Sequence, residues 1–288
     1  IFLEMNYNGC DKDVPPIVLV GKGMTFNSGG LCLKTCEEMK HMRGDMAGAA
    51  VVVAAFKAMS NLGLPINVRG LIPLCENMPG ASASRPGDII KAINGKSILV
   101  GDRYFNGQMM LADTLAYASR YHPRYIVDVG TITREMKRTL GSTASGVYTN
   151  NEVLWQLLKT ASAHSGDRLW KFPLWNIFSS EVMDLIEADI SNMNRGGTGI
   201  SSVAAAFLRQ FTIKNNWAHI DTYGVMREDG KTPYLRRGMS GRPTRTIIEF
   251  LGQLACLPLE RSSEAKDSSG KEITQENLSK LRKCTTGC

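Results

Sequence analysis

The sequence lacks the features that mark membrane-spanning, secreted and disulfide-bonded proteins. Its longest uncharged and mostly apolar stretch, residues 46–56, is shorter than the roughly 20 residues that a helix needs to cross a bilayer. No secretory leader is visible, because Ile1-Phe2-Leu3 meets Glu4 in a segment typical of a strand. The seven cysteines form an odd set without CxxC pairs, which favours a reducing, intracellular compartment.

Sites for zinc, phosphate and nucleic acid are also weakly supported. Cys32 and Cys36 lack the histidine or second cysteine pair that a zinc site needs, and the four histidines have no metal-binding spacing. Gly21-Lys22-Gly23 lacks the further glycines and the Lys-Ser/Thr step of a phosphate-binding loop. The net charge of +7 is spread along the chain, so we interpret the basic C-terminal residues as solvated surface, with an acidic or nucleic-acid partner as the alternative. These residues are Arg236, Arg237, Arg242 and Arg245.

Alternating strand and helix patterns predict an α/β fold, with a mixed, mostly parallel sheet sandwiched between helices. Segments rich in β-branched residues predict strands at 17–20, 66–74, 125–132 and 217–225. Helical patterns occupy 45–61, 107–120, 152–163, 201–213 and 244–254. We expect one domain over residues 1–257 and a polar tail, mobile or bound to a partner, over residues 258–288.

Residues 17–50 combine a buried-strand pattern with a polar loop rich in glycine. The apolar run 17–20 ends at Gly21, and loops at the carboxyl ends of parallel strands are where α/β proteins place their chemistry. This loop and the helix that follows could bring together four polar side chains, those of Lys22, Asn27, Lys34 and Asp45.

This stretch, VGKGMTFNSGGLCLK followed by MRGDMAGAA, resembles the signature of leucyl aminopeptidases, the two-metal cytosol aminopeptidase (M17 peptidase) family. The segments PINVRGLIPLCENMPG, RPGDIIKAINGK, GDRLWKFPLW, WAHIDTYGV and PYLRRGMSGRPTRTIIEFL follow in the family's order, so the resemblance extends from Phe2 to Leu257. It implies the Zn-peptidase-like fold of the family's C-terminal catalytic domain. Because the family has a further N-terminal domain, we expect this chain to be a fragment of a longer protein.

The resemblance also assigns roles to individual residues. The family holds two divalent metal ions, zinc or manganese, with a lysine, three aspartates and a glutamate, while an arginine and a second lysine flank the reacting carbonyl. Lys22 and Asp45 match two of the metal ligands, and Lys34 matches the second lysine. The other four positions carry substitutions: Asn27 and Tyr104 stand at aspartate positions, Asn106 at the glutamate position and Gln108 at the arginine position.

Three of these substitutions, at Asn27, Tyr104 and Asn106, remove negative charge from the implied metal site and leave Asp45 facing the amine of Lys22. Two divalent ions held close together need bridging carboxylates to offset their repulsion. We therefore predict no metal cofactor and a vestigial role for Lys34. A shift of register could bring Asp102 near the site, but one added carboxylate would not restore a bridged pair. Asp45 is then expected mainly to favour the first turn of its helix.

The substrate pocket that the resemblance implies is altered as well. The family's TLTGAM segment reads Thr131-Ile132-Thr133-Arg134-Glu135-Met136, so Arg134 stands where glycine allows close approach of the substrate. Tyr223 occupies a position that is usually a small alanine. We expect both side chains to crowd the pocket, and Arg134 to form an ion pair with Asp45 or Asp102.

Taken as a resemblance, these features indicate a catalytically inactive member with a structural role. The family forms homohexamers, and degenerate members in insect sperm resemble structural proteins of the flagellum, in the axoneme or the mitochondrial derivative. We therefore expect a homo-oligomer that contacts other structural proteins and no membrane. The alternatives are a metal-dependent aminopeptidase with an altered site, and a module that binds peptides or nucleic acid on the same scaffold.

Overall fold

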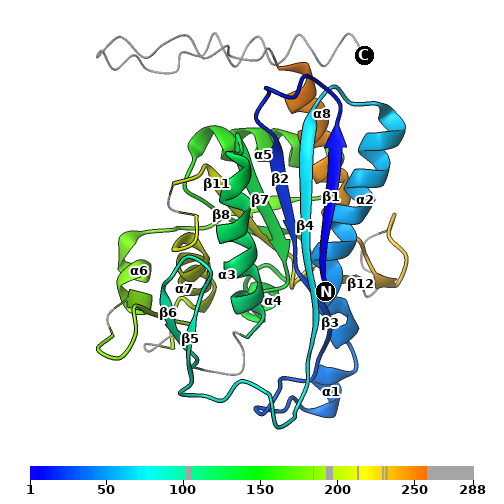
Figure 1. Cartoon of the computed structure of the whole chain (residues 1–288). Helices are drawn as coiled ribbons and strands as arrows, with labels where there is room; N and C mark the ends of the chain where they lie inside the picture. Colours follow the sequence, from blue (N-terminus) through cyan, green and yellow to red (C-terminus); the bar gives the residue numbers. More distant parts are fainter. Residues whose placement is uncertain are drawn as a thin grey trace.

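The computed structural model describes residues 1–101, 106–183, 185–192, 197–212, 214–228, 230 and 233–257, with only the main chain at Asn106. An eight-stranded sheet runs through its centre, in the order β1-β4-β2-β7-β11-β8-β9, and β3 pairs with β4 (Figure 1). The strands are β1 (Phe2–Asn8), β2 (Ile17–Gly21), β3 (Gly23–Asn27), β4 (Asn67–Asn77), β7 (Tyr125–Gly130), β8 (Ser145–Thr149), β9 (Leu169–Lys171) and β11 (Trp217–Asp221).

Most strand pairs in this sheet are parallel, as predicted. Strand β2 is parallel to β4 and β7, β11 is parallel to β7, β3 to β4, and β9 to β8. The antiparallel pairs are β1 with β4 and β8 with β11. Because the carboxyl ends of β2, β7 and β11 lie at the same edge, the loops that follow them meet there.

Helices cover both faces of the sheet, which explains why the central strands are apolar at successive positions. Ile17 and Leu19 pack with α2 (Ala47–Leu62), α5 (Glu152–Ser165) and α8 (Thr244–Cys256). Val18 and Val20 point to the opposite face and pack with α3 (Asn106–Ala118) and α7 (Ile200–Arg209). The result is a three-layer α/β sandwich (Figure 1).

Shorter elements complete the described chain. The helices are α1 (Cys36–Met39), η1 (Met42–Met46), η2 (Ser119–Tyr121), α4 (Glu135–Leu140) and α6 (Asn176–Met183). A three-stranded sheet contains β5 (Ile89–Lys91), β6 (Ser97–Leu99) and β10 (Ile190–Ser191), and a two-stranded sheet contains β12 (Arg227–Glu228) and β13 (Gly238–Met239).

The predicted long elements are all present, and two boundaries differ in a way that matters for the site. The strand predicted over 125–132 ends at Gly130, so residues 131–133 form a loop rather than strand. The helix predicted from residue 45 begins at Ala47, and Asp45 lies in the 3-10 turn η1 that precedes it. Asp45 therefore lies two residues before the α-helix whose first turn it was expected to favour. The predicted tail, 258–288, lies outside the described residues.

The continuous helical segment Met42–Leu62 is long and apolar enough to cross a membrane by length and composition alone. Its side chains at Val51, Val52, Ala55 and Met59 are fully buried against the sheet and α8. Core helices pass the same test, so the packing identifies α2 as a core helix of this fold.

Candidate functional site

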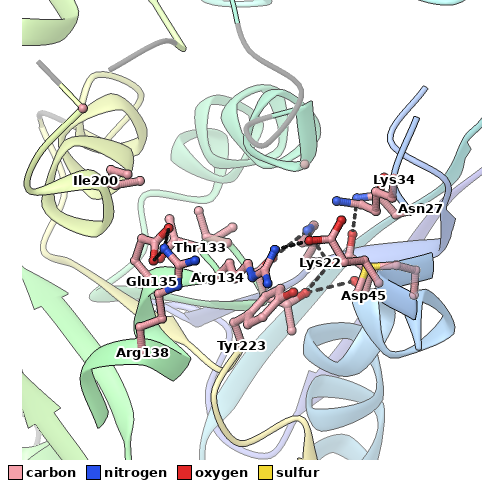
Figure 2. Close-up of a pocket in the computed structure, with 16 residues that line it drawn as sticks. Lys22, Asn27, Lys34, Asp45, Thr133, Arg134, Glu135, Arg138, Ile200 and Tyr223 are labelled. Carbon is pink, nitrogen blue, oxygen red and sulfur yellow. Dashed lines mark hydrogen bonds and ion pairs between the residues drawn. The ribbon is translucent and has the colours of Figure 1, made fainter. Parts of the chain in front are cut away.

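A cavity of about 300 Å³ opens at the carboxyl end of the parallel strands, where the predicted site residues were expected (Figure 2). Its floor contains Lys22, which follows β2, and Asn27, at the end of β3. Asp45 from η1 and Thr131 from the loop after β7 complete the floor. The sequence therefore predicted correctly that Lys22, Asn27 and Asp45 lie together.

Lys22 is a buried cation whose ammonium group donates hydrogen bonds to other groups on the floor of the cavity. Its Nζ lies 2.8 Å from Asp45 Oδ1 and 2.7 Å from the Thr131 carbonyl oxygen. Its side chain is only 3% exposed, as is that of Asp45. Gly107 passes so close that a Cβ there would lie 2.4 Å from Lys22 Nζ. The lysine amine is thus held from several sides, and position 107 has no room for a side chain unless Lys22 moves.

Both carboxylate oxygens of Asp45 accept hydrogen bonds from protein groups. Oδ1 accepts from Lys22 and from Thr131 Oγ1, at 2.8 and 2.5 Å. Oδ2 accepts from Asn27 Nδ2 at 2.8 Å. The carboxylate is therefore neutralised by one buried ammonium group and further stabilised by two neutral donors.

The orientation of the Asn27 amide is fixed by its other contacts. Its Oδ1 accepts from the Gly29 backbone N–H and from Asn77 Nδ2, both at 2.9 Å. A backbone N–H can only donate, so the oxygen must face Gly29 and the NH₂ group must face Asp45. Asn77, at the end of β4, was not singled out from the sequence, although it is the group that completes this network.

The donor set on the floor does not fit a pair of divalent metal ions. Asp45 is the one carboxylate in contact with Lys22 and Asn27 among the residues that the structure describes. Within the same residues no group of three or more His, Cys, Asp or Glu side chains could hold a metal ion. Tyr104 and Asp102 lie outside the described residues, and of Asn106 only the main chain, at the start of α3, is described.

Arg134 does not pair with Asp45, so this one of its two predicted partners is wrong. Its guanidinium forms an ion pair with Glu38 of α1 at the rim of the cavity (Figure 2). Lys22 is already bonded to Asp45, which removes the electrostatic reason for a second cation there. The other predicted partner, Asp102, lies outside the described residues. Farther along the rim, Arg138 pairs with Glu135 on the same helix, α4.

The remaining predicted residues divide into those that line the cavity and one that does not. Lys34, Arg134 and Tyr223 line it (Figure 2), and so does Thr131. Arg134 and Tyr223 were expected to crowd the pocket, yet a cavity of about 300 Å³ remains beside them. Burial raises the pKa of the Tyr223 phenol, and the charge of Asp45 acts in the same direction, so this phenol stays neutral near pH 7.

Gln108 is buried and does not line the cavity; it is the third residue of α3. Neither its amide nitrogen nor its amide oxygen has a hydrogen-bond partner among the described residues. The sequence placed it beside the reacting carbonyl; among the residues described, it is not part of the cavity lining. A buried amide without partners costs about 1–3 kcal/mol, so this side chain is a local weakness of the fold.

A buried aspartate at a strand end, Asp221, holds one wall of the cavity in place, and a second buried aspartate, Asp128, lies within β7. Asp221, the last residue of β11, accepts hydrogen bonds from the backbone N–H groups of Ile132, Thr133 and Tyr223. Burial raises the pKa of the Asp221 carboxyl. Its position at the carboxyl end of a buried strand was the sequence signal that could have identified it. His219, predicted as a packed strand residue, is buried in β11 and bonds Asp128 through Nδ1.

Comparison with known proteins places this architecture among peptidases. A family model described as "Cytosol aminopeptidase family, catalytic domain" matches residues 1–248. The chain is 48% identical over 257 residues to the cytosol aminopeptidase of Xenopus tropicalis, covering 88% of this chain and 49% of that protein. It is 46% identical over 252 residues to the cytosol aminopeptidase of Homo sapiens, covering 87% and 49%. The solved structure of the bottromycin maturation enzyme BotP matches with a TM-score of 0.81 at 35% identity, covering 88% of this chain and 55% of that one. The chain thus spans about half the length of the curated relatives it matches.

Proposed function

This chain belongs to the cytosol aminopeptidase family, and from that premise we propose that it is a catalytically inactive member with a structural, assembly-forming role. The observation that carries the proposal is the saturated carboxylate of Asp45. Its two oxygens are bonded to Lys22, Thr131 and Asn27, in the region where the family's resemblance places metal ions. An amide N–H of Asn27 points at Asp45. An aspartate at position 27 would instead offer a second carboxylate, and a metal ion could then be shared with Asp45.

The repulsion between two divalent metal ions supports the proposal more strongly than the loss of any single metal-ligand contact. Two divalent cations about 4 Å apart repel each other by roughly 15–20 kcal/mol at an effective dielectric constant near 20. Bridging and flanking carboxylates must offset that repulsion, and Lys22 already neutralises the carboxylate of Asp45. A hydrogen bond to a charged group contributes only about 1.5–3 kcal/mol, so neutral amides at the other positions would not replace the missing charge.

Hydrolysis of leucyl-p-nitroanilide in the presence of manganese or zinc tests the loss of activity. The wild-type chain, Asp45→Asn and Lys34→Met would be assayed beside the human cytosol aminopeptidase as a positive control. We expect no hydrolysis above background for the wild type, and no change in either variant. Hydrolysis by the wild type that is abolished in Asp45→Asn would refute the proposal, because the activity would then depend on the family's own ligand.

The structural role rests on the preserved scaffold. The described residues keep the full α/β sandwich with its buried core, while the polar groups of the floor bond to one another. Extending the resemblance, we propose a homohexamer that assembles with other structural proteins of the sperm flagellum, in the axoneme or the mitochondrial derivative. A sixfold mass in solution and antibody labelling of the flagellum are the expected results. A monomer, or a diffuse signal outside the flagellum, would contradict this part.

One observation favours a second candidate, binding of peptides without cleavage. The cavity of about 300 Å³ persists, and its rim carries Arg134 and Arg138 beside Glu38 and Glu135. Such a module would bind leucine-containing peptides at equal strength with and without divalent metals. An aminopeptidase with an altered, single-metal site would instead need added metal. Isothermal titration with a non-hydrolysed leucyl peptide, with manganese and with a chelator, separates the two.

A further inference from the structure

Three sulfur atoms from three different elements meet beside the start of α3. The thiol of Cys75 on β4 lies 3.9 Å from Met24 Sδ on β3 and 4.0 Å from Met110 Sδ on α3. Met24 and Cys75 are paired residues in the parallel ladder between β3 and β4, so their side chains leave the sheet on the same side. Helix α3 packs against β4 and brings Met110 to them.

We propose that Cys75, Met24 and Met110 form a binding site for a soft monovalent metal ion, of which Cu(I) is the biological example and Ag(I) the redox-inert equivalent. Thiolate and thioether ligands select soft ions over zinc, calcium or magnesium. This site is separate from the family's metal ligands and does not depend on the proposed function, since none of its three sulfurs belongs to the floor of the cavity.

The two sulfur–sulfur distances from Cys75 are compatible with an ion bound by all three residues. Metal–thiolate bonds are about 2.3 Å long, and three ligands in a trigonal plane at that radius are about 4 Å apart. The two sulfur–sulfur distances from Cys75, 3.9 and 4.0 Å, have this value before any rearrangement. The third side of the triangle, between Met24 and Met110, would be set by the two methionine side chains, which are flexible and polarizable.

Charge also favours a monovalent ion. When the ion binds, the Cys75 S–H bond breaks, its proton passes to solvent and a metal–sulfur bond forms, with no change of oxidation state. One thiolate and one monovalent cation leave a centre without net charge, whereas a divalent ion would leave a positive charge beside the apolar packing around Met24, which is only 3% exposed.

The surroundings of Cys75 give an ion access from solvent, and their net effect is to raise the pKa of the free thiol, so the thiolate forms with the bound ion. Cys75 is exposed, which gives an ion a path from solvent, while Met24 forms the buried side of the site. Burial raises the pKa of the Cys75 thiol, whereas the nearby ammonium group of Lys22 lowers it. Metal binding is expected to release one proton per ion and to weaken below neutral pH.

Alkylation of Cys75 provides the test, because it reports on one cysteine among seven. The reduced chain would be treated with one equivalent of Ag(I), or of Cu(I) under anaerobic conditions, and then with iodoacetamide, with the modification of each cysteine measured by mass spectrometry. We expect at least tenfold protection of Cys75 and little protection of Cys36 and Cys256, which are also exposed. The double variant Met24→Leu/Met110→Leu should lose at least tenfold in affinity in a competition with a Cu(I) chelator.

Matched control variants distinguish a site formed by all three sulfur atoms from binding of the ion to the Cys75 thiol alone. Met59→Leu removes a fully buried methionine elsewhere in the core and should leave the affinity unchanged. Cys36→Ser should behave like the wild type, and Cys75→Ser should lose the site. X-ray absorption of the Cu(I) complex should show sulfur ligands alone. If the double methionine variant binds Cu(I) as tightly as the wild type, or if Cys75 is not protected, the three sulfurs are only packed together and the proposal is overturned.

Discussion

The floor and the rim of the cavity both contain ion pairs, but these differ in burial and therefore in their contribution to stability. On the floor, the Lys22 and Asp45 side chains are each 3% exposed, and every carboxylate oxygen of Asp45 has a donor. On the rim, Arg134 and Arg138 are 43% and 68% exposed in their pairs with Glu38 and Glu135. Solvent screens the rim pairs, whereas breaking the floor pair leaves a buried charge without a partner. The buried pair on the floor therefore determines the stability of the site, whereas the exposed pairs on the rim affect mainly its surface charge.

The largest effect is expected from breaking the floor pair. Lys22→Met would leave the buried carboxylate of Asp45 without its cation. It should lower the free energy of unfolding by about 3–5 kcal/mol, which is the usual cost of removing one partner of a buried pair. Chemical denaturation measures this value. The double variant Lys22→Met/Asp45→Leu, which removes both charges, should recover more than half of the loss. A loss under 1 kcal/mol in the single variant would show that the pair is not energetically coupled to the fold.

The next effect tests the role of the Asn27 amide. Asn27→Asp would place a second carboxylate where Nδ2 now lies 2.8 Å from Asp45, and should destabilise the chain by about 2–3 kcal/mol at pH 8. The repulsion raises the pKa of one carboxyl in the folded state above its unfolded value. The folded variant then binds more protons than the unfolded one, so its stability should rise as the pH falls from 8 towards 5.

Thermal unfolding of Asn27→Asp with and without manganese tests whether the Asn27 amide is what excludes a divalent ion from the floor. A second carboxylate should let the floor take up a divalent ion, so manganese is expected to raise the melting temperature of Asn27→Asp and to leave that of the wild type unchanged. Equal effects of manganese on both chains would mean that Asn27 is not what excludes the ion.

Gln108 offers a change of smaller size and opposite sign. Because its buried amide has no partner among the described residues, Gln108→Leu should raise the free energy of unfolding by about 1 kcal/mol. Gln156→Leu, on α5, is the matched control, since Gln156 bonds Glu152 at the surface and its replacement should bring no gain. A destabilised Gln108→Leu variant would show that the amide is satisfied in solution.

The smallest effect is expected at the rim. Arg134→Ala removes a partly exposed ion pair and should change the free energy of unfolding by less than about 1 kcal/mol, with the remaining effect weakened by salt. A loss comparable to that of Lys22→Met would remove the distinction between floor and rim.

The sequence predicted the parts of the site that depend on strand ends, and it missed those that depend on side-chain direction. Lys22 and Asp45 were placed together because a loop after a buried strand and the following turn converge at one sheet edge. The predicted pairing of Arg134 with Asp45 was wrong, since the choice between Glu38 and Asp45 depends on the path of the loop that carries α1, and the alternative partner, Asp102, lies outside the described residues. Gln108 was placed at the reacting carbonyl, yet the start of α3 turns it into the core.

Metal content per chain tests the central claim most directly. The protein would be incubated with excess manganese and, separately, zinc, desalted, and measured by native mass spectrometry, with Asn27→Asp measured in parallel. The account predicts no retained manganese in the wild type, because Lys22, Thr131 and Asn27 already occupy both oxygens of Asp45. Two manganese ions retained per wild-type chain would contradict this prediction and would support a metal-dependent aminopeptidase instead.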